Sequence, residues 1–580
     1  MQLMKLNAIS IMAKWTLKQI KEIPSTFSLP IHLMVAKLLY SKGIESEIQI
    51  QQFIAPNYET DSHDPFAFSD MEKAVERIKV ARDEKQIVAI FGDYDADGIT
   101  SSAIIKATLD DLGISSFVYI PDKKSEGYSM NMAAVEMFKE KDVKLIITVD
   151  CGITSIAEVE KANALGIDVI ITDHHHVPNE VPKALAIINP HAPESIYPFK
   201  DLAGVGVAFK VVQAIYKKLM PEKIEQTKWM LDLVAIGTIA DCVPLVGENR
   251  LFVRYGLVVL SKTRRIGLKE LFTVGRIMID ENSVPDTKKV SFYIAPRINA
   301  AGRINHANLA YNLVVENNVA LARDFALELE ASNTQRQKIT ETVVQEVRMS
   351  AENMYKDKKF IFAIGQHFPI GVVGLVAGKI VQKFNKPTAI FQKGEFESKG
   401  SFRSIPQINI IETLGQCKDL LIRFGGHSQA AGATVANEKI EEFYEKMNSL
   451  ISQQLEGIDL AEEIIVDGEI LAEEIDFNLV EGLEKLKPFG EGNNEPIFMM
   501  KDLIVREKKT MGSGERHIKL FLSPADGCPK IFEAISFNGY EKFAHIDCGS
   551  QVDILCNIQK DEWNGNKKIQ FALIDAKNSL

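Results

Sequence analysis

The chain of 580 residues is 46% hydrophobic and 25% charged, and its formal net charge is −11 at pH 7. Its length and composition fit a globular protein of roughly three or four domains. No charge-free apolar run reaches the ~18 residues of a membrane span, and the acidic balance argues against a lysine-coated protein that covers nucleic acid without a defined site. The six cysteines are scattered and form no CxxC pair, which argues against a zinc ribbon or disulfide scaffold and predicts a reducing cytoplasm.

Residues 86–190 alternate short β-branched runs with helical patterns. The runs that predict strands are Ile87–Phe91, Phe117–Ile120, Leu145–Val149, Val169–Thr172 and Ala186–Ile188. Between them, helical patterns cover Ile99–Leu112, Asn131–Lys139 and Ser155–Leu165. This alternation favours a parallel sheet covered by helices. In such sheets ligands bind beyond the carboxyl ends of the strands.

The rest of the chain divides into three regions of different pattern. Residues 205–275 are helical, and Pro244 places Asp241 near a helix end. Residues 307–356 show long helical periodicity with many charges, as expected of a solvent-bridging helix between two domains. Strand and helix alternation resumes over 360–456. Residues 464–580 contain strand-like runs separated by Gly and Asn turns, which predict a small β-barrel; the clearest are Ile464–Val466, Ile518–Leu522, Val552–Ile558 and Ile569–Ile574.

The segment Asp93-Tyr-Asp-Ala-Asp-Gly98 carries three alternating carboxylates directly after a predicted strand. Like charges this close raise one another's pKa unless a cation offsets them, and a hard divalent metal ion is the simplest such cation. A calcium-binding EF-hand loop begins in the same way, but it needs a bidentate Glu where this chain has Ile104, and a helix where this chain has a strand. The alternative without a metal ion is an acidic turn with solvated side chains.

Two other predicted strands also end in candidate metal ligands. Asp150 follows Val149, and its alternative role is to cap the next helix. Asp173-His174-His175-His176 follows Thr172, and a histidine beside a carboxylate suits manganese or a similar ion. A surface histidine cluster or a structural zinc site would look similar. Gly204-Val-Gly206 is too short for dinucleotide binding and is interpreted as a turn into the helix Val207–Leu219.

These motifs resemble, in order, the four motifs of the DHH phosphoesterase superfamily: Asp93–Gly98, Asp150, Asp173–His175 and Asp241. Later segments are similar to one branch of it, the RecJ single-stranded-DNA-specific exonucleases. These segments are Leu202–Phe209, Pro296–Arg303, Ser401–Arg403, Phe424–Gly432 and Pro488–Asn493. The resemblance extends from about Lys14 to the end of the chain.

The resemblance implies an α/β protein with a parallel-sheet DHH domain, joined by a long helix to a second α/β DHH-associated domain, plus a C-terminal OB-like β-barrel. The expected parts are an N-terminal extension and helical segment (1–60), the DHH catalytic domain (61–306), the connecting helix (307–356), the DHH-associated nucleic-acid-binding domain (357–460) and the OB-fold domain (461–580).

The resemblance further implies a phosphodiesterase with two divalent cations, for which Mn²⁺ is favoured over Mg²⁺ because a histidine is present. The implied metal ligands are Asp93, Asp95, Asp97, Asp150, His174 and Asp241. Asp150 would bridge the ions, and His175 would support the site or contact the scissile phosphate. The role of Asp93 stays open.

The resemblance also suggests contacts with nucleic acid. Arg297 and Arg303 would bind phosphate through their guanidinium groups, or would form salt bridges between the connecting helix and the first domain. Ser401 and Arg403 fall in a region that resembles a pocket for the 5′-terminal phosphate. Gly425, Gly426 and His427 would approach the strand closely, or would form a tight turn with a packed histidine. In the barrel, the candidate stacking residues are Phe521, Phe537 and Trp563, although core packing is the favoured alternative for each of them. They accompany the basic residues Lys501, Arg506, Lys508, Lys509, Arg516 and Lys519.

The implied activity is hydrolysis of single-stranded DNA from the 5′ end to 5′-mononucleotides, in recombination and repair. A RecQ-type helicase and single-strand-binding protein are the partners that the family suggests. The alternative enzyme is a DHH phosphodiesterase acting on short oligonucleotides or cyclic dinucleotides, whose relatives are shorter and lack the barrel. A degenerate relative that acts only as a scaffold would have lost metal ligands, and here all of them are present.

Overall fold

The computed structural model describes residues 13–19, 21–24, 27–122, 126, 127, 129–304, 306–355, 357–461, 463–512, 514–563 and 566–579. The chain divides into two compact units. One contains residues 63–243 and 252–461 and carries both α/β domains. The other combines residues 1–62, 244–251 and 462–580 and carries the barrel.

A five-stranded parallel sheet in the order β3-β2-β4-β5-β6 forms the centre of the first α/β domain. Its strands are β2 (Ile87–Gly92), β3 (Ser116–Tyr119), β4 (Val143–Val149), β5 (Asp168–Thr172) and β6 (Ala186–Ile188). All five strands that the sequence predicts are present, with ends within two residues of the prediction. Their near-continuous apolar character follows from burial on both faces of the sheet.

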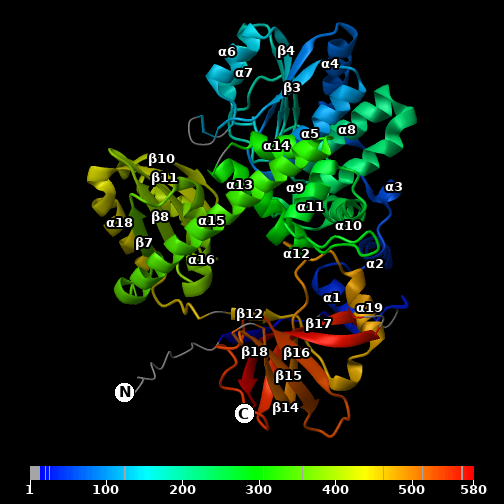
Figure 1. Ribbon diagram of the computed structural model, residues 1–580, viewed down its shortest axis with the longest axis vertical. Coiled ribbons are helices and arrows are strands. Elements are labelled where there is room, and N and C mark those ends of the chain that lie inside the picture. The colour runs from blue at the N-terminus through cyan, green and yellow to red at the C-terminus, as the bar shows by residue number, and fades with distance from the viewer. Residues whose placement is uncertain are drawn as a thin grey trace. The chain divides into compact units, whose positions relative to one another are not determined.

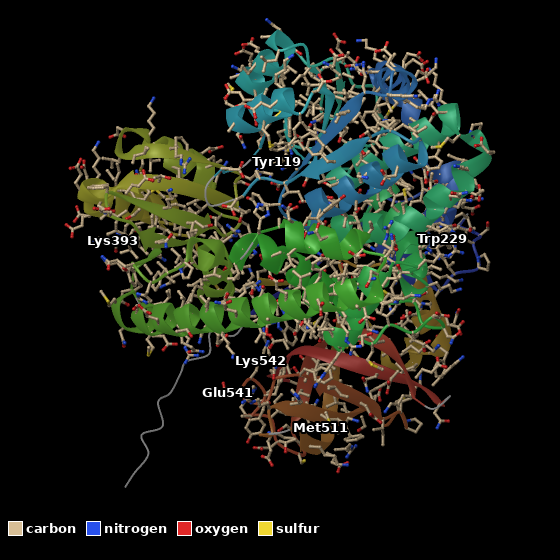
Figure 2. All side chains as sticks on the ribbon, turned by 45° about the horizontal axis from the view of Figure 1, so that its top comes forward. Tyr119, Trp229, Lys393, Met511, Glu541 and Lys542 are labelled. Atoms are coloured by element: carbon tan, nitrogen blue, oxygen red, sulfur yellow. The ribbon has the colours of Figure 1, made fainter. Side chains whose placement is uncertain are left out.

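Helices cover both faces of this sheet, as expected for strands joined by right-handed crossovers. α6 (Met132–Glu140) and α7 (Ile156–Ala164) cover one face, and α4 (Met71–Asp83), α5 (Ala96–Asp111) and α8 (Gly204–Leu219) cover the other (Figure 1). On the first face, the ring of Tyr119 lies 5.6 Å from the rings of both Phe91 and Phe138. Tyr119 is labelled in Figure 2, at the end of its strand.

A mainly helical region follows the sheet. It comprises the short helix η2 (Pro221–Met230), α9 (Leu231–Ala240), α10 (Gly247–Ser261), α11 (Ile266–Val274), α12 (Thr287–Lys289), the π-helix η3 (Val290–Ile294) and α13 (Ala295–Ile304). A short helix, η1 (Pro65–Ala67), precedes α4. α5 packs against α8 and α9, which places three helix ends beside the carboxyl edge of the sheet.

The connecting segment differs from the single solvent-bridging helix that its periodicity predicts. α14 (Asn308–Val315) ends before Glu316, and α15 (Val319–Met354) begins at Asn318, whose side chain accepts hydrogen bonds from the amides of Ala320 and Leu321. α15 also buries one face along its length, against α11 and α13 in its first half and α16 in its second. The helix therefore joins the two domains through a packed face. Its many exposed charges make this face difficult to predict from the sequence.

The second α/β domain has a mixed sheet in the order β10-β11-β9-β8-β7, in which only β7 and β8 are parallel. The strands are β7 (Ile361–Gly365), β8 (Thr388–Lys393), β9 (Glu397–Arg403), β10 (Leu421–Gly426) and β11 (Ala430–Ala436). The helices are α16 (Ile370–Phe384), α17 (Ile410–Gly415) and α18 (Ile440–Gln454), with short turns η4 (Lys418–Leu420) and η5 (Asn437–Lys439). α16 packs on β8 and β9 beside α15.

The C-terminal region forms the predicted barrel. β14 (Phe498–Met511), β15 (His517–Pro524), β16 (Phe532–Ser536), β18 (Asn566–Asn578) and β17 (Gln551–Trp563) pair in that order, and β17 pairs back with β14 to close the ring. The short strand β13 (Gly468–Glu469) pairs in parallel with β14, and α19 (Phe477–Lys485) follows the turn η6 (Ala472–Glu474). Closure removes the unpaired strand edges of an open sheet.

The N-terminal segment shares the barrel's core. α1 (Leu33–Ser41) and α2 (Glu47–Ile54) contribute buried residues such as Val35, Leu39 and Ile50 to the same apolar cluster as the barrel strands, and α3 (Tyr58–Asp61) follows them. β1 (Lys14–Leu17) pairs in parallel with β12 (Glu463–Val466). Among the described helices, none is long and apolar enough to cross a membrane.

Candidate metal centre and its surroundings

Four polar residues follow four neighbouring strands at one edge of the parallel sheet. Gly92, Val149, Thr172 and Ile188 are aligned across β2, β4, β5 and β6. The next residues along the chain are therefore Asp93, Asp150, Asp173 and Asn189, side by side at the carboxyl edge. The Asp150 amide donates to the Thr172 carbonyl at 2.9 Å and the Asp173 amide to Ile188 at 3.1 Å, so the ladder continues to these residues.

Asp95 and Asp97 are held at helix N-termini. Asp95 caps α5 and accepts hydrogen bonds from the amides of Asp97 and Gly98 at 3.0 and 3.1 Å. Asp97 lies in the first turn of α5 and is almost fully buried. Its two carboxylate oxygens accept hydrogen bonds from the first amides of α8, those of Gly204 and Val205, both at 2.8 Å. Two helix N-termini, each with a partial positive charge, therefore face the same carboxylates.

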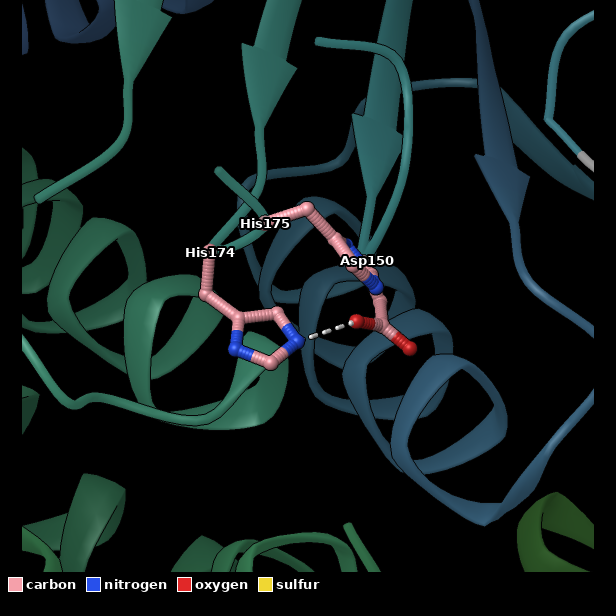
Figure 3. A group of neighbouring side chains, drawn as sticks. All are labelled: Asp150, His174 and His175. Carbon is pink, nitrogen blue, oxygen red and sulfur yellow. Dashed lines mark ion pairs between the residues drawn. The ribbon is translucent and has the colours of Figure 1, made fainter. Parts of the chain in front are cut away.

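Asp150 and His174 meet at the centre of the cluster. His174 Nε2 lies 3.2 Å from Asp150 Oδ1 (Figure 3). It lies 3.6 Å from Asp241 Oδ2. Asp241 comes from the C-terminal end of α9. Asp150 has a φ of +59°, a left-handed conformation that is uncommon outside glycine and is found at functional sites. Neither Asp150 Oδ1 nor His174 Nε2, both buried, makes a hydrogen bond within the described part of the chain.

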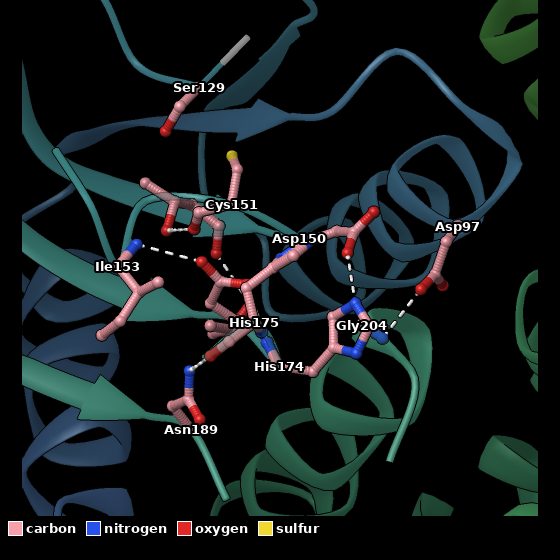
Figure 4. Close-up of polar contacts among 12 residues, drawn as sticks. Asp97, Ser129, Asp150, Cys151, Ile153, His174, His175, Asn189 and Gly204 are labelled. Atoms are coloured by element: carbon pink, nitrogen blue, oxygen red, sulfur yellow. Dashed lines mark hydrogen bonds and ion pairs between the residues drawn. The ribbon is translucent and has the colours of Figure 1, made fainter. Parts of the chain in front are cut away.

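Asp173 organises the histidine loop. Its Oδ2 accepts from the Ile153 amide at 3.0 Å, and its Oδ1 accepts from the amides of His174 and His175 at 2.8 and 3.1 Å (Figure 4). His175 Nδ1 also contacts Oδ1 at 2.7 Å. The buried Asn189 donates from Nδ2 to the His175 carbonyl at 3.0 Å, which fixes the same loop from the next strand. These bonds fix the loop that carries both histidines, and the Nδ1 contact orients the His175 ring.

The carboxylates repel one another strongly. Burial, followed by the charge of Asp95, raises the pKa of Asp97 to about 7 despite its hydrogen bonds to backbone amides. Burial and then the charges of Asp97 and Asp95 raise the pKa of Asp241 to about 9. The same causes raise the pKa of Asp150 well above its usual value. Such a cluster holds its negative charge at neutral pH only when a cation offsets it.

The two histidines differ in charge. Burial, and then the neighbouring His175, lowers the pKa of His174 to about 4, so this ring is neutral at pH 7 and suited to metal binding. Burial alone would lower the pKa of His175, but the hydrogen bond with Asp173 outweighs it and raises that pKa to about 9. Burial likewise tends to raise the pKa of Asp173, and its bond with His175 reverses the effect and lowers it.

The donor set fits divalent cations. Three groups of ligand atoms each lie within 4.8 Å of one another: Asp150 with His174 and His175, Asp97 with His174 and Asp241, and Asp93 with Asp95 and Asp150. These groups overlap at Asp150 and His174 and so form one continuous cluster. Oxygen ligands with a single imidazole suit Mn²⁺ or Mg²⁺. The buried Asp150 Oδ1 and His174 Nε2, which make no hydrogen bond to any residue that the structure describes, are the atoms that a cation would satisfy.

The two arginines of α13 have different surroundings. Arg297 is buried and bidentate on Glu330 of α15, and its guanidinium also donates to the Tyr293 carbonyl at 2.7 Å. This arrangement favours the salt-bridge alternative for Arg297 over phosphate binding. Arg303 instead donates to the Gly371 carbonyl at 3.1 Å and makes no ion pair within the described chain. Its nearest charged neighbours include Asp95, so it lies next to the carboxylate cluster.

The predicted residues of the second domain divide into two groups. Ser401 and Arg403 lie on the same face of β9, two residues apart, and Arg403 Nη1 donates to Ser401 Oγ at 3.2 Å. Gly425 and Gly426 end β10, and Gly426 has a φ of +142° in the turn to β11. His427 follows in this turn, where its ring is exposed and lies 6.1 Å from the ring of His176. The glycines do form a tight turn, but the histidine is not packed in the core.

The sequence alone did not indicate a role at the site for two residues, Gly204 and Asn189. Gly204 is the first residue of α8, so the helix begins three residues earlier than predicted. A Cβ at Gly204 would lie 2.4 Å from Asp150 Oδ1, so only glycine lets the α8 amides reach Asp97 beside Asp150. Asn189 could have been found from its place after a predicted strand, in the same position as Asp93, Asp150 and Asp173.

Family models match three parts of the chain. The DHH family N-terminal domain matches residues 87–238, the DHHA1 domain matches 357–453, and the RecJ OB domain matches 466–575. These ranges correspond to the parallel-sheet domain, the mixed-sheet domain and the barrel.

Curated relatives are similar over nearly the whole chain. The single-stranded-DNA-specific exonuclease RecJ of Bacillus subtilis is 36% identical over 553 residues, which cover 95% of this chain and 69% of the relative. The exonuclease of the same name from Salmonella typhimurium is 31% identical over 580 residues, covering 96% of this chain and 98% of the relative.

Solved structures show the same arrangement of elements. RecJ from Thermus thermophilus in complex with Mn²⁺ matches with a TM-score of 0.83 and 26% identity, covering 99% of this chain and 80% of that one. An exonuclease RecJ bound to manganese matches with a TM-score of 0.60 and 30% identity, covering 69% of this chain and all of that one.

Proposed function

Because the chain belongs to the RecJ family of single-stranded-DNA-specific exonucleases, we propose that it hydrolyses single-stranded DNA from the 5′ end and releases 5′-mononucleotides. The observation that carries this proposal is the cluster of ligand atoms at the sheet edge, with Asp150 common to two of its groups. The alternative, a phosphodiesterase limited to short oligonucleotides or cyclic dinucleotides, is not favoured, because the relatives that match the whole chain, including its barrel, are exonucleases.

The metal ligands that we propose are Asp93, Asp95, Asp97, Asp150, His174 and Asp241, with Asp150 bridging two divalent cations. Mn²⁺ is favoured and Mg²⁺ is also compatible with the donor set. When bound, two such cations about 3.5–4 Å apart would activate a water molecule and stabilise the leaving oxygen. The similarity to RecJ structures in complex with Mn²⁺ and Mg²⁺ supports this choice.

His175 is the proposed contact to the scissile phosphate. Its bond with Asp173 raises its pKa to about 9, so the ring is protonated at neutral pH and can donate a hydrogen bond to a phosphate oxygen. Asp173 acts as a positioning residue, because it is committed to His175 and to three backbone amides.

The proposed 5′ polarity rests on the cationic residues beside the cluster. Arg303, Ser401 and Arg403 would receive the terminal phosphate, and Gly425, Gly426 and His427 would contact the strand. Two glycines of α16 support this arrangement. A Cβ at Gly371 would lie 2.4 Å from the Arg303 carbonyl oxygen, and one at Gly374 would lie 3.0 Å from Ser401 Oγ. The N-terminal part of α16 therefore lies close to the Arg303 backbone and the Ser401 side chain, and its first amides add to the positive surroundings.

The barrel is the proposed binding site for the rest of the strand. Phe521 has the ammonium groups of Lys509 and Lys519 at 5.0 and 5.7 Å from its ring, and Phe537 is 74% exposed. Several of the predicted basic residues are ion-paired, as Lys501 is with Glu469 and Lys519 with Glu533. Because these ion pairs reduce the positive charge available to the strand, we expect stacking on exposed aromatic rings to be an important part of this binding. The Trp563 side chain lies outside the described residues.

The test is digestion of a single strand with Mn²⁺, labelled in parallel at either end. We expect the 5′ label to appear in mononucleotides before the 3′ label, and a bulky block at the 5′ end to stop digestion. Persistent full-length strand, or digestion only from the 3′ end, would refute the proposal. A RecQ-type helicase and single-strand-binding protein as partners, a cytoplasmic location and the domain boundaries stay predictions.

A further inference from the structure

A small cavity of about 140 Å³ lies among α9, η3, α13, α15 and α16, all within one compact unit. Apolar side chains such as Ile239 and Leu375 form part of its wall. Asn299, Arg303 and Arg336 supply polar groups. Arg303 already belongs to the proposed terminal-phosphate site. Arg336 lies on the connecting helix α15 and is not among the residues of that proposed site.

Arg336 is held in place but lacks a charged partner. Its Nη2 donates to Oδ1 of the buried Asn333, one turn earlier on α15, at 2.9 Å. Its Nε is buried and makes no hydrogen bond within the described chain. Two other arginines packed on or belonging to α15 are ion-paired: Arg297 binds Glu330, and Arg348 contacts Glu352 at 3.3 Å. Arg336, which lines the cavity, has no such carboxylate partner among the described residues.

Arg303 and Arg336 line this cavity, and the charge of Arg303 acts on both Arg336 and Arg403. Burial, and then the charge of Arg303, lowers the pKa of both Arg336 and Arg403. Among the described residues, neither Arg303, Arg336 nor Arg403 forms an ion pair with a carboxylate. Arginine nevertheless stays charged in proteins. All three side chains are partly buried, and charges withdrawn from water are normally paired, so this arrangement indicates a site for an anion.

We propose that Arg336 is a specificity-determining residue that binds the 5′-terminal phosphate of the strand from the side of α15. A terminal phosphate monoester carries a charge of about −1.5 to −2 at neutral pH, more than the single charge of each internal phosphodiester. A site with three guanidinium groups therefore selects a phosphorylated strand end. This inference rests on the proposed function and adds a residue that determines which end group is preferred.

The experiment compares one strand in two forms, with a 5′-phosphate and with a 5′-hydroxyl group. Wild type is expected to have the lower KM for the phosphorylated form. Arg336→Gln should raise that KM by about 10- to 100-fold, the range for loss of charge-assisted hydrogen bonds, and leave the KM for the hydroxyl form nearly unchanged. Arg336→Lys should fall between them, because lysine keeps the charge and loses the planar fork. Arg348→Gln, on the same helix, is the matched control and should behave as wild type.

A second measurement does not depend on DNA hydrolysis. Inorganic phosphate added to the metal-free protein should raise its unfolding temperature, and Arg336→Gln should lose this increase while Arg348→Gln keeps it. Equal stabilisation of all three proteins would overturn the inference, as would equal losses of activity on both strand forms. If wild type degrades neither strand but phosphate still stabilises it through Arg336, the proposed function fails while the anion site stands.

Discussion

Replacing Gly204 with alanine tests how closely the helix α8 must approach the carboxylate cluster. The added Cβ would lie 2.4 Å from Asp150 Oδ1 and 2.7 Å from its Cγ. Ordinary contact begins near 3.4 Å, so α8 or Asp150 must move by about 1 Å. Neither can move independently, because the Gly204 amide binds Asp97 and the Asp150 amide binds Thr172.

The expected loss is large for activity and small for stability. A displacement of about 1 Å in a catalytic arrangement costs on the order of 100-fold in rate. Overpacking costs typically about 1–3 kcal/mol, and alanine in a helix recovers about 0.5–1 kcal/mol relative to glycine. We therefore expect kcat/KM on single-stranded DNA to fall about 100-fold, while the free energy of unfolding falls by less than about 2 kcal/mol.

Gly206→Ala is the matched control for this prediction. Its Cβ would meet only the end of the Leu202 side chain, at 3.1 Å, which can rotate away. The assay is steady-state hydrolysis with Mn²⁺, together with denaturant unfolding of both variants and wild type. Wild-type activity in Gly204→Ala, or equal losses in the two variants, would refute the reasoning.

Three further predictions follow from the same site. Asp95→Asn keeps an oxygen that can cap α5 but removes the negative charge. The rate of cleavage should therefore fall at least about 100-fold, while strand binding in a fluorescence assay changes little. An unchanged rate of cleavage would contradict the proposed ligand set. Arg297→Gln should lower the free energy of unfolding by about 2 kcal/mol, because Glu330 loses its partner, and should leave the preference for a 5′-phosphate intact; lost preference with full stability would show that Arg297 binds the strand. The pKa values of Asp97 and Asp241 are raised to about 7 and about 9, so the folded metal-free protein keeps protons that the unfolded chain releases above about pH 4. The free energy of unfolding of the metal-free protein therefore falls as pH rises toward 9, and Mn²⁺ restores it. In EDTA, Asp97→Asn should make the unfolding temperature fall less steeply with pH. An unchanged slope would argue against the raised pKa of Asp97 as a cause of this fall.

The edge of the parallel sheet could be predicted because its signals are local. Each strand is a short apolar run, and the parallel order brings the residues after Gly92, Val149 and Thr172 to one edge. Asp93, Asp150 and Asp173 therefore emerge from pattern alone. Whether each of the predicted ligands binds a metal stays a prediction, since the geometry shows their proximity and not an ion.

The features that the sequence did not reveal depend on contacts between distant segments. Gly204 is constrained by Asp150, which lies more than fifty positions away, and no local pattern indicates that contact. Arg336 resembles any exposed arginine of a charged helix until the cavity beside Arg303 is known. The N-terminal helices share the barrel's core although about four hundred residues separate them in the chain.

The break before α15 has a different cause. The pair Glu316 and Asn318 interrupts the helix because Asn318 caps the next one, while the apolar spacing continues on both sides. The helical periodicity therefore predicts one continuous helix across a boundary that only the capping residue marks.

In the proposed mechanism, the carboxylate cluster holds two divalent cations for hydrolysis of the strand. The most direct measurement is anomalous scattering from crystals of the protein grown with Mn²⁺. We expect two peaks about 3.5–4 Å apart, both within coordination distance of Asp150, with His174 and Asp241 on one side and Asp93 or Asp95 on the other. A single peak, or peaks away from Asp150, would contradict the two-cation mechanism.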